Sequence, residues 1–261
     1  MAKPKKVSKS AAKVVKKKDD EITISLDSFG VPIAIVIAGI VIALAIFFTN
    51  NRANKNNVDT TKNDNTATQN DDTQPGAKAT GTIGNAPYIG DKSKAKVAII
   101  EYSDFGCGYC ARHASQVFPE LKKNYVDTGK VIYVFKSFPL SSSGASYNTA
   151  VAAPCVYEQV GGEKFAQFHS EAFTKKTDAE VRSLALSYGV DGGKYDTCLS
   201  DKKYEGDVTA ERTEGSNAGI SGTPGFSVGV IGDDGKVTGE LIKGAYPLET
   251  FDAAIARVMP K

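Results

Sequence analysis

The chain has no tryptophan and, in 261 residues, two methionines, two histidines and four cysteines. Such scarcity limits metal chemistry, because a structural zinc site needs four closely spaced cysteine or histidine ligands. Cys107 and Cys110 could supply two ligands and His113 a third, but a second Cys-x-x-Cys or a His-x-x-x-His is missing. We therefore predict no metal site and no cofactor.

A surplus of positive charge is also missing outside the first residues. Residues 1–18 hold eight lysines and no acidic residue, whereas residues 51–261 hold 24 basic and 26 acidic residues. Nucleic-acid binding requires clustered basic charge, so we predict no nucleic-acid partner. We interpret the lysine-rich segment as a topology signal that lies near anionic lipid head groups.

One long hydrophobic run, residues 31–48, contains no charged residue. At helical rise it spans about 27 Å, close to the bilayer hydrocarbon thickness of about 30 Å. We predict a transmembrane anchor over residues 29–49. The basic tail, residues 1–28, would stay in the cytoplasm and the rest of the chain would lie outside, because positive charge beside a first helix is retained inside. A cleaved signal peptide is the alternative, although no clear small-residue cleavage site follows the run.

Residues 50–84 are rich in Asn, Asp, Thr, Lys and Gln and poor in large apolar side chains. This composition cannot bury enough surface to offset the entropy of ordering, so we predict a disordered linker. From residue 85 to residue 261 the pattern is typical of a globular domain, which the linker would tether to the membrane.

The globular part combines strand and helix patterns. Apolar runs predict a strand before residue 104, a second strand near residues 130–135 and a late hairpin over residues 225–242. A helix follows the first strand, a block of helices occupies about residues 141–218, and residues 248–258 form a last helix. This order predicts an α/β fold with a helical insertion.

A Cys-x-x-Cys motif, Cys107 to Cys110, stands where the first strand leads into its helix. The first turn of a helix has unpaired N–H groups and a positive dipole end, which favour a thiolate. The thiolate is the species that attacks disulfides, and two cysteines three positions apart can close on each other. We predict a redox-active pair. A structural bridge is an alternative, as is a binding module that captures a soft metal such as Cu(I) without turnover.

The other two cysteines, Cys155 and Cys198, fall in separate predicted helices of the insertion. Cysteines in an exported protein commonly pair, so we predict a structural disulfide that closes a loop of about 44 residues. The alternative is two free, buried cysteines that act as small apolar side chains.

Three motifs together resemble those of the DsbA-type thiol-disulfide oxidoreductases of the thioredoxin superfamily. They are Glu101-Tyr-Ser-Asp-Phe-x-Cys-x-Tyr-Cys-x-x-His113, Phe165-x-x-Phe-His-x-x-x-Phe173 and Gly219-Ile-Ser-Gly-Thr-Pro-x-Phe226. The resemblance covers about residues 85–261. It implies a thioredoxin fold with a helical insertion.

The resemblance also implies roles for individual residues. Cys107 would be the nucleophile that forms a mixed disulfide with the substrate, and Cys110 the resolving cysteine. Pro224 would be a cis-proline beside them. Thr223 would offer backbone groups to an extended substrate chain.

Glu101 stands where the family often has a buried acid, which suggests proton transfer to Cys110. The alternative is a strand residue that faces water at the edge of the sheet. For His113 and His169 we predict a packing or capping role on their helices.

The dipeptide between the cysteines, Gly108-Tyr109, should tune thiolate stability and contact the substrate. Strong oxidants of the family commonly have Pro-His there, whereas Gly-Tyr also occurs in the dimeric isomerase relatives called DsbC. The direction of exchange therefore stays open between an oxidase and a reductase or isomerase.

These observations predict a bacterial, membrane-anchored enzyme with its catalytic domain outside the cytoplasm. It would act as a monomer and introduce disulfide bonds into reduced exported proteins. The resemblance implies that a quinone-linked membrane partner of the DsbB or vitamin K epoxide reductase type reoxidises it.

Overall fold

The computed structural model describes residues 76–260. The predicted tail, the predicted anchor and residues 50–75 of the predicted linker lie outside this part of the chain. Within it, none of the helices is both long enough and apolar enough to cross a lipid bilayer. In chain order the elements are β1 (Ala77–Thr82), β2 (Tyr88–Ile89), β3 (Val97–Ser103), α2 (Gly108–Gln116), α3 (Phe118–Leu121), the π-helix η2 (Lys122–Val126), β4 (Val131–Ser137), α4 (Ala145–Ala172), α5 (Asp178–Ser187), α6 (Gly192–Ser200), α7 (Glu205–Asn217), β5 (Gly225–Ile231), β6 (Lys236–Lys243) and α8 (Leu248–Val258).

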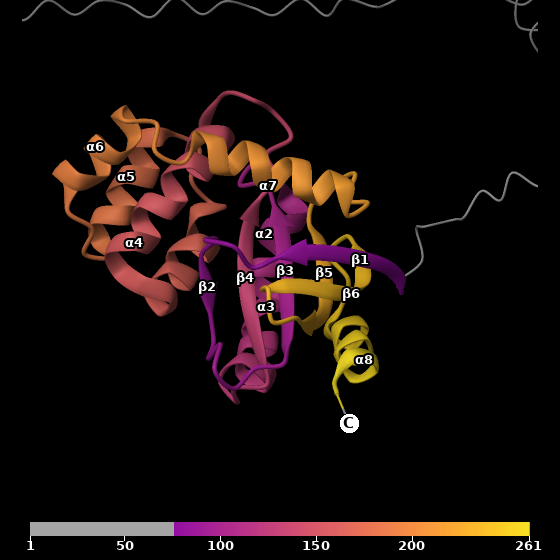
Figure 1. Cartoon of the computed structure of the whole chain (residues 1–261). Coiled ribbons are helices and arrows are strands. Elements are labelled where there is room, and N and C mark those ends of the chain that lie inside the picture. Colours follow the sequence, from indigo (N-terminus) through magenta and orange to yellow (C-terminus); the bar gives the residue numbers. More distant parts are fainter. Residues whose placement is uncertain (1–75, 261) are drawn as a thin grey trace, which may run out of the picture. The chain divides into compact units, whose positions relative to one another are not determined.

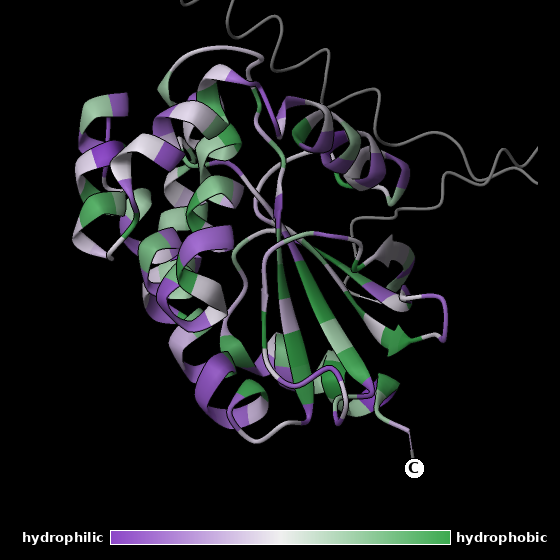
Figure 2. Ribbon diagram, turned by 60° about the vertical axis from the view of Figure 1, so that its left-hand side comes forward, coloured by the Kyte–Doolittle hydropathy of each residue, from purple (hydrophilic) through white to green (hydrophobic). Residues whose placement is uncertain are grey.

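The strands form one mixed sheet in the order β1-β6-β5-β3-β4-β2. β3 pairs with β4 in parallel, and the other pairs are antiparallel. All seven residues of β3 are buried, because β4 and β5 flank the strand and helices cover the sheet. Hydrophobic residues are concentrated on these central strands (Figure 2). The predicted α/β class, late hairpin and helical insertion are confirmed.

Alternate residues of β3 point to opposite faces of the sheet. Ile99 lies in the cluster that α2, α4 and α8 cover, and Glu101 shares that face. Tyr102 lies on the other face, where its hydroxyl donates to Glu214 Oε1 of α7 at 2.6 Å. Lys136 of β4 donates to the same carboxylate oxygen at 2.7 Å. Glu101 and Glu214 thus lie on opposite faces of the sheet.

The helical insertion runs from α4 to α7, and α4 packs against the edge strand β2 (Figure 1). Within α4, Gly161 has a φ of 74°, which breaks the helix in two. Gly162 lies so close to β2 that a Cβ there would be 2.5 Å from the carbonyl oxygen of Tyr88. A disulfide between Cys155 and Cys198 ties α4 to α6, with Cα atoms 6.1 Å apart.

The first strand corrects the predicted domain boundary. The composition predicts a disordered linker as far as residue 84, yet Ala77–Thr82 forms β1 and pairs in register with β6. Its buried side chain is the small Ala79, so hydrophobicity gives almost no signal; backbone pairing with β6 holds the strand. β2 has two residues, too few for any alternation to show.

Candidate active site

Asp104 organises the loop that carries the first cysteine. Its carboxylate accepts hydrogen bonds from the backbone N–H of Gly106 at 2.6 Å, from that of Leu140 at 2.7 Å and from the hydroxyl of Ser146. Its carbonyl oxygen accepts from the backbone N–H of Cys107 at 2.9 Å. These bonds fix the chain between β3 and α2, so that Cys107 becomes the N-cap residue of α2.

The two thiols are free and differ in exposure. Cys107 is partly exposed, whereas Cys110, one turn into α2, is 0% exposed. Burial raises the pKa of the Cys110 thiol, and the negative charge of Glu101 raises it further. A molecule in solution can therefore reach the sulfur of Cys107, whereas the sulfur of Cys110 is shielded from solvent.

The loop before β5 lies against Cys107. The Cys107 thiol donates to the carbonyl oxygen of Thr223 at 3.2 Å, and the Thr223–Pro224 peptide bond is cis. The backbone of Thr223, which the family resemblance assigns to substrate binding, thus contacts the Cys107 sulfur from 116 residues away in the sequence.

The rim of the site is open around the dipeptide between the cysteines. A Cβ added to Gly108 would meet nothing within 4 Å, and Tyr109 is 62% exposed. The guanidinium of Arg112 lies 5.1 Å from the centroid of the Tyr109 ring. The exposed Tyr109 ring therefore offers apolar contact area beside the cysteine pair, outside any cavity.

Glu101 is 1% exposed in the middle of the sheet. The alternative that it faces water at an edge is wrong, because β4 and β5 flank its strand. Burial raises its pKa from the ordinary 4.5 to about 7, against a hydrogen bond that Tyr133 donates to Oε2 at 2.9 Å. Oε1 has no partner among the described residues. The carboxyl group can hold or release a proton near neutral pH.

Both histidines are buried among aromatic rings. His113 is 0% exposed and packs on Phe226 and Phe251, at centroid distances of 4.6 and 5.3 Å. His169 packs on Phe135 at 4.6 Å and lies 3.5 Å from the hydroxyl of Ser103. Burial lowers the pKa of each to about 3, so both imidazoles are neutral at physiological pH.

A family model described as Thioredoxin matches residues 82–255. The chain belongs to the thioredoxin family. It is 28% identical over 184 residues to a provisionally named protein-disulfide oxidoreductase of Rickettsia felis, covering 67% of this chain and 60% of the relative. The chain thus spans about three fifths of that relative's length. Disulfide bond formation protein D of Bacillus subtilis is 29% identical over 99 residues, 38% of this chain and 43% of that protein.

Solved structures of this family agree on the architecture. α-DsbA1 of Wolbachia pipientis superposes with a TM-score of 0.56 at 25% identity, covering 67% of this chain and 92% of that one. Oxidised BdbD of Bacillus subtilis gives a TM-score of 0.58 at 20% identity, covering 70% and 98%. The DsbA-type thioredoxin fold with its helical insertion is confirmed.

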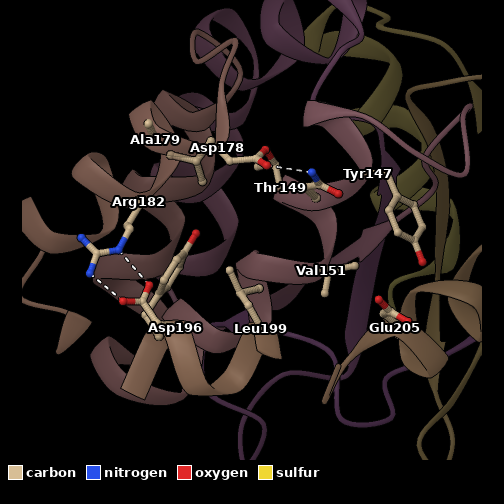
Figure 3. Close-up of a pocket in the computed structure, with 12 residues that line it drawn as sticks. Tyr147, Thr149, Val151, Asp178, Ala179, Arg182, Asp196, Leu199 and Glu205 are labelled. Atoms are coloured by element: carbon tan, nitrogen blue, oxygen red, sulfur yellow. Dashed lines mark hydrogen bonds and ion pairs between the residues drawn. The ribbon is translucent and has the colours of Figure 1, made fainter. Parts of the chain in front are cut away.

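This thioredoxin-family chain also has a cavity of about 350 Å³ in the helical insertion, away from both free cysteines. Figure 3 shows Arg182 in a two-pronged ion pair with Asp196, at 2.8 and 2.7 Å. Asp178 accepts from the side chain of Asn148 at 2.8 Å. These charged groups are thus paired with side chains of neighbouring helices. Among the described residues, no group of three or more His, Cys, Asp or Glu side chains is arranged to hold a metal ion.

Sequence reasoning missed three residues that shape the site. Tyr133 contacts Glu101, while Asp104 and Ser146 fix the cysteine loop. Tyr133 alternates with Ile132 and Val134 in a strand and could have been placed on the face of Glu101 from the parallel register. The contact of Ser146 with Asp104 spans 42 residues, and no local pattern predicts it.

Proposed function

We propose that the chain is an extracytoplasmic thiol-disulfide oxidoreductase that introduces disulfide bonds into exported proteins through Cys107 and Cys110. The observation that carries this proposal is the asymmetry of the pair: an accessible sulfur at a helix N-terminus beside a cis-proline, and a fully buried sulfur behind it. The names of the relatives, which include a disulfide bond formation protein, support the same reaction class.

The reaction begins with the Cys107–Cys110 disulfide closed. A substrate thiolate attacks the exposed sulfur of Cys107, and the electron pair of the broken bond goes to Cys110. A second substrate thiolate then attacks the substrate sulfur of the mixed disulfide and releases Cys107 as a thiolate. The substrate loses two electrons and two protons: the cysteine pair gains both electrons, Cys110 takes one proton, and the other proton goes to solvent.

Glu101 serves the buried sulfur in this scheme. Because burial disfavours a charged Cys110, the departing thiolate needs a proton at once, and the protonated Glu101 carboxyl can donate it. In the reverse direction, during reoxidation, ionised Glu101 accepts the Cys110 proton. A pKa of about 7 suits both tasks at neutral pH.

Substrate and partner contacts follow from the rim. The backbone of Thr223 pairs with an extended substrate segment, and Tyr109 supplies an exposed ring beside it. A quinone-linked membrane protein reoxidises the pair, and the hydrophobic run at residues 31–48 anchors the chain near that partner, which raises its effective concentration. The Gly108-Tyr109 dipeptide favours a second candidate, a reductase or isomerase that uses the same residues in the opposite direction.

Mixed-disulfide capture tests the role of each sulfur. Cys110→Ser, activated at Cys107 as a mixed disulfide with an aromatic thiol, should transfer to a reduced, unfolded protein and accumulate as a stable covalent complex. Cys107→Ser, treated in the same way, should form little complex because Cys110 is buried. Equal capture by both variants would contradict the assignment of Cys107 as the nucleophile.

A further inference from the structure

Two buried side chains extend from Glu101 into the core. The Tyr133 hydroxyl lies 2.9 Å from Glu101 Oε2, and His113 Nε2 lies 3.0 Å from the same hydroxyl. Tyr133 and His113 are both 0% exposed. The three residues come from β3, β4 and α2, so the hydrogen-bond chain crosses three elements that meet beneath the cysteines.

The direction of this chain follows from counting protons. A tyrosine hydroxyl has one proton, and ionised Glu101 can only accept. If Tyr133 donates to the carboxylate, its oxygen must accept from His113, which then carries its proton on Nε2. Nδ1 of His113 is buried without a partner among the described residues and is left bare. Because burial keeps the imidazole of His113 neutral, the hydrogen-bonded series from Glu101 to His113 carries no net positive charge.

We propose that Tyr133 and His113 are positioning residues for Glu101: the chain from His113 Nε2–H through the Tyr133 hydroxyl to Glu101 Oε2 stabilises the ionised carboxylate and fixes its orientation. This inference rests on the proposed function, because it assigns a purpose to the Glu101 proton. Hydrogen bonds in series polarise one another, so loss of His113 as a donor should weaken the bond that Tyr133 makes.

The surroundings leave few other groups to hold the carboxylate. The titratable side chains near this hydrogen-bonded series are Cys110 of α2, Cys107 at the N-cap of α2, and His169 of α4. α3, β5 and α8 contribute the rings of Phe118, Phe226 and Phe251. None of these rings can donate a hydrogen bond to a carboxylate. Tyr133 is the one donor recorded for Glu101 in the described part of the chain.

Carboxyl ¹³C NMR of the full reduced chain, assigned with Glu101→Gln, tests the proposal directly. Tyr133→Phe should raise the midpoint of the Glu101 titration by about 1 to 2 pH units, because a hydrogen bond to the charged carboxylate is lost. Tyr102→Phe is the matched control: it removes a bond of a buried tyrosine to a carboxylate on the other face of the sheet and should leave the Glu101 midpoint unchanged. An unmoved or lowered midpoint in Tyr133→Phe would overturn the proposal.

His113 gives a second readout that needs no change at Tyr133. His113→Phe should raise the Glu101 midpoint by less than Tyr133→Phe, and His113→Gln, which keeps an N–H donor, should restore it in part. In the unsubstituted chain above the Glu101 midpoint, ¹⁵N NMR should show His113 protonated on Nε2 and bare on Nδ1. The opposite tautomer would refute the proposed donor order, from His113 through Tyr133 to Glu101, even if the variants failed to fold.

The kinetics separate this inference from the proposed function. When Cys110 attacks a preformed mixed disulfide at Cys107, the pH midpoint of the rate should move with the Glu101 midpoint in Tyr133→Phe. If the NMR midpoint moves and the rate profile does not, positioning stands and proton transfer by Glu101 is wrong. If the NMR midpoint stays fixed, the positioning role is wrong whatever the rates do.

Discussion

Replacing Glu101 with Gln should make the stability of the protein less dependent on pH. The fold raises the pKa of this carboxyl from 4.5 to about 7, so it favours the neutral form. Glu101 therefore contributes stability that is fully present below about pH 4.5 and is lost as the pH rises through about 7. The pKa difference corresponds to about 3 kcal/mol.

Glutamine is neutral at every pH and keeps an oxygen that can accept from Tyr133. The free energy of unfolding of the Glu101→Gln variant, relative to that of the unsubstituted protein, should thus rise by about 3 kcal/mol between about pH 4.5 and about pH 8. The absolute difference at one pH also contains the desolvation of the amide, so the change with pH is the quantity predicted.

Urea unfolding in a Cys107→Ala, Cys110→Ala background measures this change. That background needs no reductant, so the Cys155–Cys198 disulfide stays closed in both folded and unfolded chains. Glu249→Gln, an exposed residue of α8, is the control and should give a flat difference. A flat difference for Glu101→Gln as well would refute the claim that the fold holds this carboxyl neutral.

Three further changes test the scaffold by urea unfolding. Replacing Cys155 and Cys198 with Ala should cost about 4 kcal/mol, because the bridge constrains a loop of about 44 residues in the unfolded chain; no loss would show that it constrains little. Lys136→Met should cost about 3 kcal/mol, the low end for a buried pair since 25% of the Glu214 side chain is exposed, and Lys136→Arg should cost less. Gly162→Ala should cost about 1 to 3 kcal/mol because its Cβ meets the Tyr88 carbonyl, whereas Gly206→Ala, open in α7, should be neutral or stabilising.

The strands and helices that the sequence predicts are those with a strong local pattern. β3 and β4 are apolar runs, and α5 begins at a capping box in which Thr177 and Glu180 bond each other's backbone. β1 was missed because small and polar residues form it. Its stability comes from pairing with β6, in which the partner of Ala77 is Leu241, 164 residues later in the chain. A single local window holds no information about such a partner.

The residues of the cysteine site likewise divide into those that a local sequence pattern predicts and those whose contacts depend on the fold. Cys107 and Cys110 could be predicted because their spacing and place after a strand are local features. The burial of Glu101 could be inferred through the family resemblance, while its contact with Tyr133 depends on the parallel register of β3 and β4. Asp104 and Ser146 meet across a loop, so their contact appears only in the folded chain.

The equilibrium reduction potential of the Cys107–Cys110 pair tests the central claim most directly. It would be measured on the full chain with Cys155 and Cys198 replaced by Ala, so that the pair is the one dithiol observed. A value near about −120 mV, that of the strong oxidant DsbA, is the result expected for a donor of disulfides. A value near about −270 mV, that of a reducing thioredoxin, would contradict the proposed direction and assign the same residues to a reductase.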